Sequence, residues 1–443
     1  MRINNINIKN FRCFADRSFN FGPKMNVVLG NNATGKTTLL HAVQIALGAY
    51  LQSLSLLPKE LPFRRNFRST DRVLKYNIEK DEHFYSKENP YICVESTFKT
   101  IGKKNGNPFE EEKKISWYRE MVGNTTIHSK KNVGQLIDTV KTLSDIRESE
   151  GTDSDVVLPI VLAFGADRID KNYKLVVKDK KKDSRIAKAY KFALDEKVDF
   201  KSALDWYCRF NTTAKSGKEV EGTDRAFINA LETAVGIKNI ELDSTNRNFW
   251  ADVSVEGKET ERLHYGIMSS GFKAMINMVA EIAYRCIMLN RWLGIDAVEK
   301  TPGIVMIDEM DLYLHPLWQR HVLEDFQRAF PNIQFIVTSH SPFIVQSVKS
   351  ENIIKLDGEK GNSDPNIRNM EEVAVVEMNV PSMHTDNYNK MLEKADEFYN
   401  LIKQGNSTPE EKARIKKELV ELEAKFSENP AYVALLKAEG EIK

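Results

Sequence analysis

The chain has 443 residues, of which 41% are hydrophobic and 29% charged, and its formal net charge is +1. This composition is that of an ordinary globular protein with a full core, and the near-neutral charge argues against a global attraction to nucleic acid or acidic lipid. The polar start MRINNINIKN, the lack of an apolar run of about 20 residues and four isolated cysteines argue against a signal peptide, a membrane span and a C-x-x-C zinc site. We therefore expect a cytoplasmic protein with no membrane partner.

Residues 1–50 predict a strand, a turn, a second strand that is buried, a loop and a helix. Ile6–Phe14 has the mixed pattern of a strand, and Met25–Leu29 is a short apolar run of the kind found in buried strands. Thr37–Leu51 places apolar residues at helical spacing. A buried strand, a loop and a helix in this order form the context in which phosphate-binding loops occur.

The loop Gly30–Thr37 between this strand and this helix matches the pattern G-x-x-x-x-G-K-[ST] at every fixed position. Such a loop points backbone N–H groups at phosphate oxygens, and the following helix adds the positive end of its dipole. We expect Lys36 to reach the β- and γ-phosphates and the Thr37 hydroxyl to bind Mg²⁺. The predicted nucleotide-binding residues here are Gly30, Asn31, Asn32, Ala33, Thr34, Gly35, Lys36, Thr37 and Thr38.

The middle of the chain predicts strands first and helices later. Residues 58–130 are rich in turn signals, and two stretches alternate like antiparallel strands, Tyr91–Lys99 and Lys114–Glu120. Val156–Phe164 is apolar and predicts another buried strand. Further on, the sequence predicts an inserted helical lobe with helices at Ser184–Leu194, Phe200–Phe210 and Asp224–Val235, then a hairpin of Ile240–Asp243 and Trp250–Val255 with the turn Glu256-Gly257-Lys258.

Residues 267–357 carry the strongest α/β pattern. Helices alternate with strands here, in the order Phe272–Leu289, Ile304–Ile307, Leu317–Ala329 and Gln334–Thr338. This alternation implies a parallel sheet that is covered by helices on both faces. From about residue 384 the chain is highly charged and predicts two amphipathic helices.

Two acidic residues, Asp308 and Glu309, end the apolar strand Ile304–Ile307. A carboxylate at the end of such a strand is suited to hold Mg²⁺ beside a phosphate loop, which is the role predicted for Asp308. Glu309 is then predicted to orient and deprotonate the attacking water. Without the phosphate loop, the pair would be read equally well as two exposed acids.

The spacing of these motifs and three further segments resemble an ABC-type ATPase. The phosphate loop and the acidic pair lie about 270 residues apart, and Met268–Phe272 resembles the ABC signature, with matches at Ser269 and Gly271. In that class the signature caps the γ-phosphate of ATP bound to a partner subunit, which implies a dimer with ATP and Mg²⁺ as cofactors. The alternative for Ser269 is an ordinary helix cap. The resemblance further implies a switch histidine at His340 and an interface residue at Asp311.

The N-terminal segment Ile8–Phe14 resembles the opening of the RecF, SMC and OLD branch of this class. There an arginine, here Arg12, touches nucleotide phosphate or DNA; a plain surface arginine is the alternative. No glutamine marks a Q-loop after Phe164, where Asp167 and Arg168 are weak substitutes.

Only about 100 residues follow His340, and no D-x-D pattern is found in them, so we expect no nuclease domain in this chain. A compact ATPase of this kind resembles the ATPase subunit of the Septu anti-phage systems, including its retron-associated form, which acts with a separate HNH nuclease. The resemblance implies an ATPase that forms nucleotide-sandwich dimers and controls a partner nuclease. The alternative is a RecF-like DNA-binding repair ATPase without such a partner.

A basic stretch with phenylalanines, at Arg64, Arg65 and Arg68, could contact DNA or RNA. A solvated loop packed by its phenylalanines explains the same pattern. Altogether the sequence predicts an α/β fold: a P-loop ABC-type ATPase head with an antiparallel β subdomain, an inserted helical lobe and a C-terminal helical tail. The predicted segments are an N-terminal ATPase half at 1–168, the lobe at 169–238, a C-terminal ATPase half at 239–360, and a tail for partner or oligomer contacts at 361–443.

Overall fold

The structure is a computed structural model of the chain. It describes residues 1–57, 65–77, 81–104, 107–149, 156–166, 184–214, 221–243, 248–254, 260–358, 361 and 363–381, with scattered single positions beyond. The chain divides into two compact units, Met1–Asn379 and Val380–Lys443. All elements below belong to the first unit, and the predicted tail helices lie almost entirely outside the described residues. The first unit runs past the segment boundary predicted at 361, because helix α10 belongs to it.

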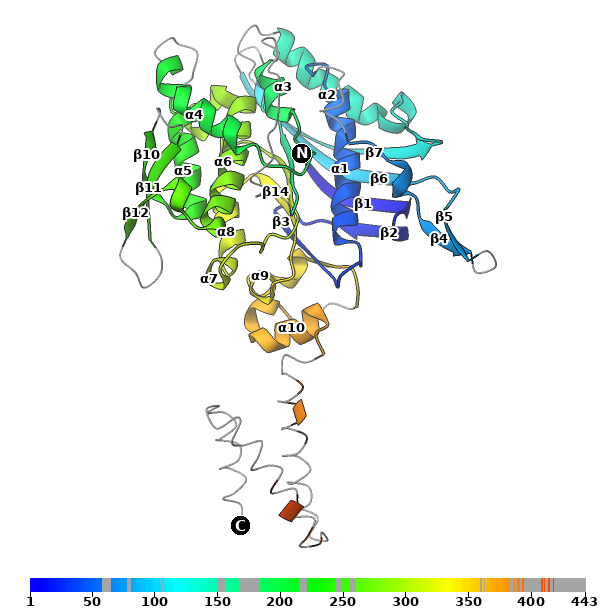
Figure 1. The fold of residues 1–443 in the computed structure, drawn as a ribbon. Helices are drawn as coiled ribbons and strands as arrows, with labels where there is room; N and C mark the ends of the chain where they lie inside the picture. Colours follow the sequence, from blue (N-terminus) through cyan, green and yellow to red (C-terminus); the bar gives the residue numbers. More distant parts are fainter. Residues whose placement is uncertain are drawn as a thin grey trace. The chain divides into compact units, whose positions relative to one another are not determined.

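A five-stranded parallel sheet lies at the centre of the first unit (Figure 1). Its order is β15-β3-β14-β13-β9, so strands from the two ends of the chain lie side by side. Every residue of the middle strands is buried, as the apolar runs predicted. The strands are β3 (Met25–Leu29), β9 (Ile160–Phe164), β13 (Gly303–Ile307), β14 (Ile333–Thr338) and β15 (Ile353–Lys355).

A second, antiparallel sheet has the order β2-β1-β6-β7-β8. The buried side chain of Gln334 on β14 joins the two sheets, since it accepts the N–H of Ile3 and donates to the carbonyl of Ile3, each at 2.8 Å. Helix α1 (Lys36–Ser53) packs between the sheets, against β6, β7 and β14. The strands are β1 (Arg2–Phe11), β2 (Phe14–Asn20), β6 (Tyr91–Lys104), β7 (Asn107–Val122) and β8 (Thr125–Thr126).

The single strand predicted at Ile6–Phe14 is wrong. The chain reverses at Arg12 and Cys13, so that Phe11 pairs with Phe14. Arg12 has a left-handed backbone (φ 50°), and its N–H donates to the carbonyl of Asp71 at 2.9 Å. This tight turn was not predicted because arginine and cysteine are not the residues that mark two-residue hairpin turns.

The helical lobe predicted in the middle of the chain contains α3 (Arg185–Tyr190), α4 (Phe200–Ala214) and α5 (Thr223–Val235). All three pack against the long helix α6 (Ser270–Asn290), which also contacts β9. A three-stranded sheet follows the lobe, with β10 (Lys238–Asp243), β11 (Asn248–Val253) and β12 (Glu261–His264). The pairing of β10 with β11 confirms the predicted hairpin. The residues predicted as its turn, 256–258, instead separate β11 from β12 and lie outside the described residues.

The helix predicted at Leu317–Ala329 is split into α7 (Pro316–Gln319) and α8 (Val322–Ala329). The backbone leaves helical geometry at His321 (φ −127°), which caps the second helix. The remaining helices and strands are β4 (Leu74–Asn77), β5 (Glu82–Tyr85), α2 (Lys130–Ser149), α9 (Pro342–Gln346) and α10 (Met370–Met378), with short 3-10 turns at Ser69–Asp71, Tyr265–Ile267, Arg291–Asp296, Ser350–Asn352 and Pro365–Ile367. Among the described residues, no helix combines the length and apolar character needed to cross a membrane.

Candidate nucleotide-binding site

The phosphate loop connects β3 to α1 and has a backbone that few residues tolerate. Gly35 has φ 107°, and a Cβ at this position would lie 2.6 Å from Sγ of Cys13 and 2.7 Å from Cζ of Phe14. Ala33 is also left-handed, with φ 65°. Glycine is therefore required at 35 both by conformation and by the close approach of the β1–β2 turn.

Lys36, the first residue of α1, is buried beneath this loop. Its Nζ donates to the carbonyls of Gly30 at 2.7 Å and Asn31 at 3.0 Å. Burial lowers the pKa of Lys36 from its ordinary value, while the neighbouring carboxylates of Asp308 and Asp357 act in the opposite direction. The ammonium group is thus held at the base of the loop, where phosphate oxygens can replace the carbonyls as partners.

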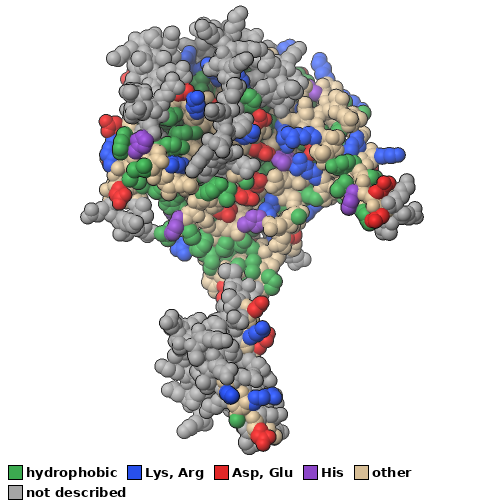
Figure 2. Space-filling view, in the orientation of Figure 1, with side chains coloured by type: hydrophobic (Ala, Val, Ile, Leu, Met, Phe, Trp, Pro, Cys, Tyr) green, Lys and Arg blue, Asp and Glu red, His purple; other side chains and the backbone are tan. Residues whose placement is uncertain are grey.

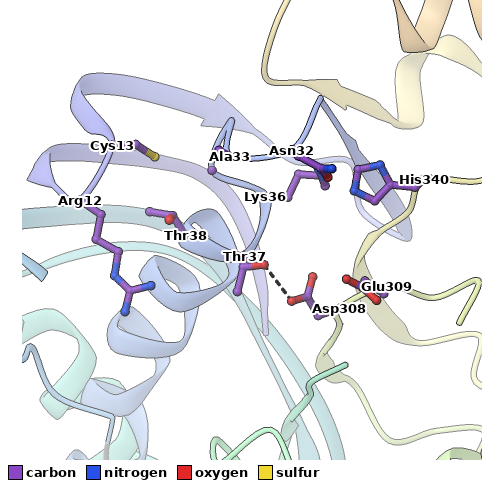
Figure 3. A pocket seen from close by; sticks show the side chains of 11 residues that line it. Arg12, Cys13, Asn32, Ala33, Lys36, Thr37, Thr38, Asp308, Glu309 and His340 are labelled. Atoms are coloured by element: carbon purple, nitrogen blue, oxygen red, sulfur yellow. Dashed lines mark hydrogen bonds between the residues drawn. The ribbon is translucent and has the colours of Figure 1, made fainter. Parts of the chain in front are cut away.

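A cavity of about 290 Å³ opens above the loop (Figure 3). Arg12 and Cys13 lie at one end and Asp308, Glu309 and His340 at the other, with Thr37 between them. Most of the predicted site residues meet here, although Gly30, Asn31 and Thr34 shape the loop without lining the cavity. The lining residues are Arg12, Cys13, Asn32, Ala33, Gly35, Lys36, Thr37, Thr38, Asp308, Glu309 and His340.

Asp308 and Thr37, the two predicted Mg²⁺ ligands, are in direct contact. The hydroxyl of Thr37 donates to Oδ2 of Asp308 at 2.9 Å, across 271 residues of sequence. Asp308 follows β13 directly, and its N–H donates to the carbonyl of Phe164 at 2.8 Å. A hydroxyl and a carboxylate side by side supply the oxygen ligands that Mg²⁺ prefers.

Glu309 is half-buried in the cavity and has a left-handed backbone (φ 51°). Its N–H donates to the hydroxyl of Thr338 at 2.8 Å, and the same hydroxyl donates to Oδ1 of Asp308. One side chain therefore orients both acidic residues. Thr338 was missed by sequence reasoning, although its place at the end of β14, directly beside the end of β13, was a usable signal.

Asp311 is turned inward and holds the loop after β14. Its Oδ1 accepts from the hydroxyl of Ser339 at 2.6 Å and from the N–H of His340 at 3.3 Å. His340 is exposed and lines the cavity. Asp311 itself does not line it, so within one chain it acts on the site through the His340 loop.

Comparison with known proteins identifies the family. The AAA domain family matches residues 5–245, more than half of the chain, and a second AAA domain family matches residues 234–346. The chain belongs to the AAA domain family.

Three relatives narrow the assignment. The "Retron Ec83 probable ATPase" of Escherichia coli is 24% identical over 477 residues that cover 91% of this chain and 80% of the relative. The "Septu protein PtuA" of Bacillus mycoides is 30% identical over 175 residues, which cover 36% of this chain and 22% of the relative. The "DNA replication and repair protein RecF" of Bacillus cytotoxicus is 30% identical over 124 residues, which cover 27% of this chain and 29% of the relative. This AAA domain protein is an ATPase of the ABC type, in the RecF/SMC/OLD branch, as its motifs predicted.

The predicted signature residues of this ATPase, Ser269 and Gly271, do not line the phosphate-loop cavity. Ser269 is exposed and caps α6, where its hydroxyl accepts the N–H of Phe272 at 3.4 Å. A Cβ on Gly271 would lie 2.7 Å from the carbonyl of Tyr313, so glycine lets α6 approach this loop. Both residues line a second cavity of about 1060 Å³, formed with the end of α5, β11, β12 and α7–α8. We call it the signature cavity.

Three polar residues near the site were also missed. Asp357, two residues after β15, accepts the N–H of the loop residue Asn31 at 3.0 Å. His41 on α1 and Glu196, between α3 and α4, contact each other and connect to Arg12. Asp357 had a usable signal, since it follows a strand beside β3. His41 and Glu196 had none, because their meeting depends on the packing of the lobe.

The predicted nucleic-acid patch is only partly described. Arg64 lies outside the described residues, as do the weak Q-loop candidates Asp167 and Arg168. Arg65 is half-buried, its backbone approaches Gly48 of α1, and burial lowers its pKa. Arg68 is exposed. On the face shown in Figure 2, basic and acidic side chains are interspersed, so contact with DNA or RNA stays a prediction.

Proposed function

We propose that this ATPase binds ATP and Mg²⁺ in the phosphate-loop cavity, and that a second copy must close over the nucleotide before hydrolysis. The observation that carries the proposal is the separation of Ser269 and Gly271 from the phosphate loop within one chain. A serine hydroxyl and the N-terminus of a long helix form a group suited to an anion. In one chain this group faces the signature cavity, so the phosphate of a nucleotide bound by a partner's phosphate loop is its natural ligand.

The residues that line the cavity would have different roles in binding and hydrolysis. Lys36 and the loop N–H groups would bind the phosphates, and Thr37 and Asp308 would hold Mg²⁺, which neutralises phosphate charge when bound. Glu309 would orient the attacking water and accept its proton. His340 would donate a hydrogen bond to the γ-phosphate. Asp311, which accepts hydrogen bonds from the loop that carries His340, would lie at the interface with the partner and link dimer formation to the position of His340.

We further propose that the closed dimer controls a separate nuclease of the HNH class in anti-phage defence. The similarities to a retron ATPase and to a Septu protein support this assignment. Co-purification from the native operon tests it directly: a small HNH protein should remain bound to the ATPase. Recovery of the ATPase without a nuclease, together with tight DNA binding that weakens steeply with salt, would favour the RecF-like alternative.

Mixing two inactive variants tests the shared site. Ser269→Arg should block the signature and Lys36→Ala should block ATP binding, so neither variant alone hydrolyses ATP. In an equal mixture, half of the dimers contain both chains, and each of these has one intact site. About one quarter of the wild-type activity should therefore return.

Ser184→Arg is the matched control, because Ser184 is an exposed residue that caps α3 through the N–H of Ala187. This variant should keep full activity, which separates loss of the signature from loss of a helix cap. If the mixture of Ser269→Arg and Lys36→Ala stays inactive while each variant is folded, the shared site is refuted.

A further inference from the structure

A chain of polar side chains runs from the cavity along helix α1. Arg12 donates to Oδ1 of Asp71 from Nε at 2.8 Å and from Nη2 at 2.7 Å, and its Nη1 contacts Nδ1 of His41. Nε2 of His41 lies 2.7 Å from Oε1 of Glu196, which also accepts from Gln44 at 2.7 Å. We call Asp71, Arg12, His41 and Glu196 the Arg12 relay.

The chemistry of arginine fixes the direction of this relay. A guanidinium has only donors, so Nδ1 of a neutral His41 must accept and its proton must sit on Nε2, the atom 2.7 Å from Oε1 of Glu196. The two groups are close enough to interact, although they are not aligned as a hydrogen bond. Burial alone would raise the pKa of Glu196, but the contacts with His41 and Gln44 dominate and lower it to about 2. Glu196 is therefore a carboxylate, at the end of the relay opposite the ion pair of Arg12 with Asp71.

The backbone shows that the relay is imposed by the fold. Arg12 and Glu196 are both left-handed, with φ 50° and 63°, a conformation that costs free energy in residues other than glycine. Gly165, directly after β9, donates its N–H to the carbonyl of Glu196 at 2.7 Å. A Cβ on Gly165 would lie 2.9 Å from Cβ of Glu196. Glu196 is thus held at the end of the parallel sheet, where the catalytic carboxylates also lie.

We propose that His41 and Glu196 are positioning residues that hold the Arg12 guanidinium at the end of the phosphate-loop cavity away from Asp308 and Glu309, where it binds nucleotide phosphate. The proposal rests on the proposed nucleotide site. Arg12 and Cys13 lie at the end of the cavity opposite Asp308 and Glu309 (Figure 3). Three of the five N–H groups of Arg12 serve the described contacts, and the side chain is 27% exposed. The other two can turn to an anion without breaking the relay.

A double-mutant cycle separates positioning from general support of the fold. Dissociation constants for ATP and ADP would be measured with the Arg12→Ala, His41→Leu and Glu196→Ala variants and with each double variant that includes Arg12→Ala. Each single variant should weaken binding about tenfold, the range of a charged hydrogen bond. The double variants should be no weaker than Arg12→Ala, since His41 and Glu196 act through Arg12.

Two further variants complete the experiment. Glu196→Gln keeps an oxygen that can accept from His41 and should bind ATP nearly as well as the wild type. Asp195→Ala removes the neighbouring exposed carboxylate and should have no effect. If Glu196→Ala does not fold, the cycle of His41→Leu with Arg12→Ala decides by the same criterion.

The outcomes distinguish this proposal from the site itself. Additive losses, or weak binding by Arg12→Ala with normal binding by His41→Leu and Glu196→Ala, would overturn the relay and leave the nucleotide site intact. A wild-type chain that binds neither nucleotide would instead refute the proposed function.

Discussion

The phosphate-loop cavity and the signature cavity differ in how far one chain completes them. In the first, Thr37 already contacts Asp308, and Thr338 orients both acidic residues. In the second, Ser269 is exposed, Tyr313 is 50% exposed with a left-handed backbone (φ 69°), and the space is more than three times larger. The residues predicted to bind Mg²⁺ and activate water meet within one chain, while Ser269, which is predicted to cap the nucleotide, is exposed at the surface.

This difference suggests a way for such an ATPase to make hydrolysis depend on dimer formation. A preorganised site needs little rearrangement to stabilise developing charge. If that site were complete in one chain, ATP would be consumed without any signal to a partner. In the dimer proposed above, a second chain would supply Ser269 to the catalytic machinery, so the two cavities should respond differently to substitution.

The largest effect is expected from Glu309→Gln. Loss of the general base should lower kcat by at least about 100-fold, while Lys36 and the loop N–H groups continue to bind ATP. The variant should then accumulate as an ATP-bound dimer, which light scattering can detect beside steady-state hydrolysis. Glu299→Gln, at an exposed position before β13, is the control. Unchanged turnover in Glu309→Gln would remove Glu309 as the base.

A smaller effect is expected from Thr338→Val. The substitution removes the donor to Asp308 and the acceptor of the Glu309 N–H, and should lower kcat about tenfold and stability by about 1–3 kcal/mol. Thr338→Ser keeps the hydroxyl and should restore most of the activity. Parallel measurements of hydrolysis and thermal unfolding test this expectation. If Thr338→Ser loses as much activity as Thr338→Val, packing of the Thr338 methyl group matters more than its hydroxyl.

The sequence predicted the parts of the fold that depend on local pattern. The apolar runs gave the buried strands Met25–Leu29 and Ile304–Ile307, and the phosphate loop was recognised because its glycines and lysine have fixed spacing. The split of the predicted helix at His321 and the turn at Arg12 were not visible. The turn depends on the carbonyl of Asp71, which is 59 residues away in the sequence.

The same limit applied to the site. Asp308 and Glu309 were predicted because acids at the end of an apolar strand are a recognisable pattern, and the structure places both in the cavity. His41 and Glu196 are 155 residues apart and meet only through packing of the lobe. Sequence patterns predict the groups that would act on a ligand directly. They miss the residues that hold those groups, since the partners come from distant elements.

Asp357 is such a residue, and its substitution should have the smallest effect. Its Oδ2 accepts the Asn31 N–H, while Oδ1 is buried without a hydrogen-bond partner among the described residues. Asp357→Asn keeps an oxygen for Asn31 but removes a negative charge beside the phosphates, so ATP should bind about threefold tighter. The gain should shrink at high salt, and the exposed Glu351→Gln should show none. Weaker ATP binding by Asp357→Asn would instead mean that the carboxylate charge is needed to shape the phosphate loop. The cavity would then depend on a residue outside its lining for its conformation.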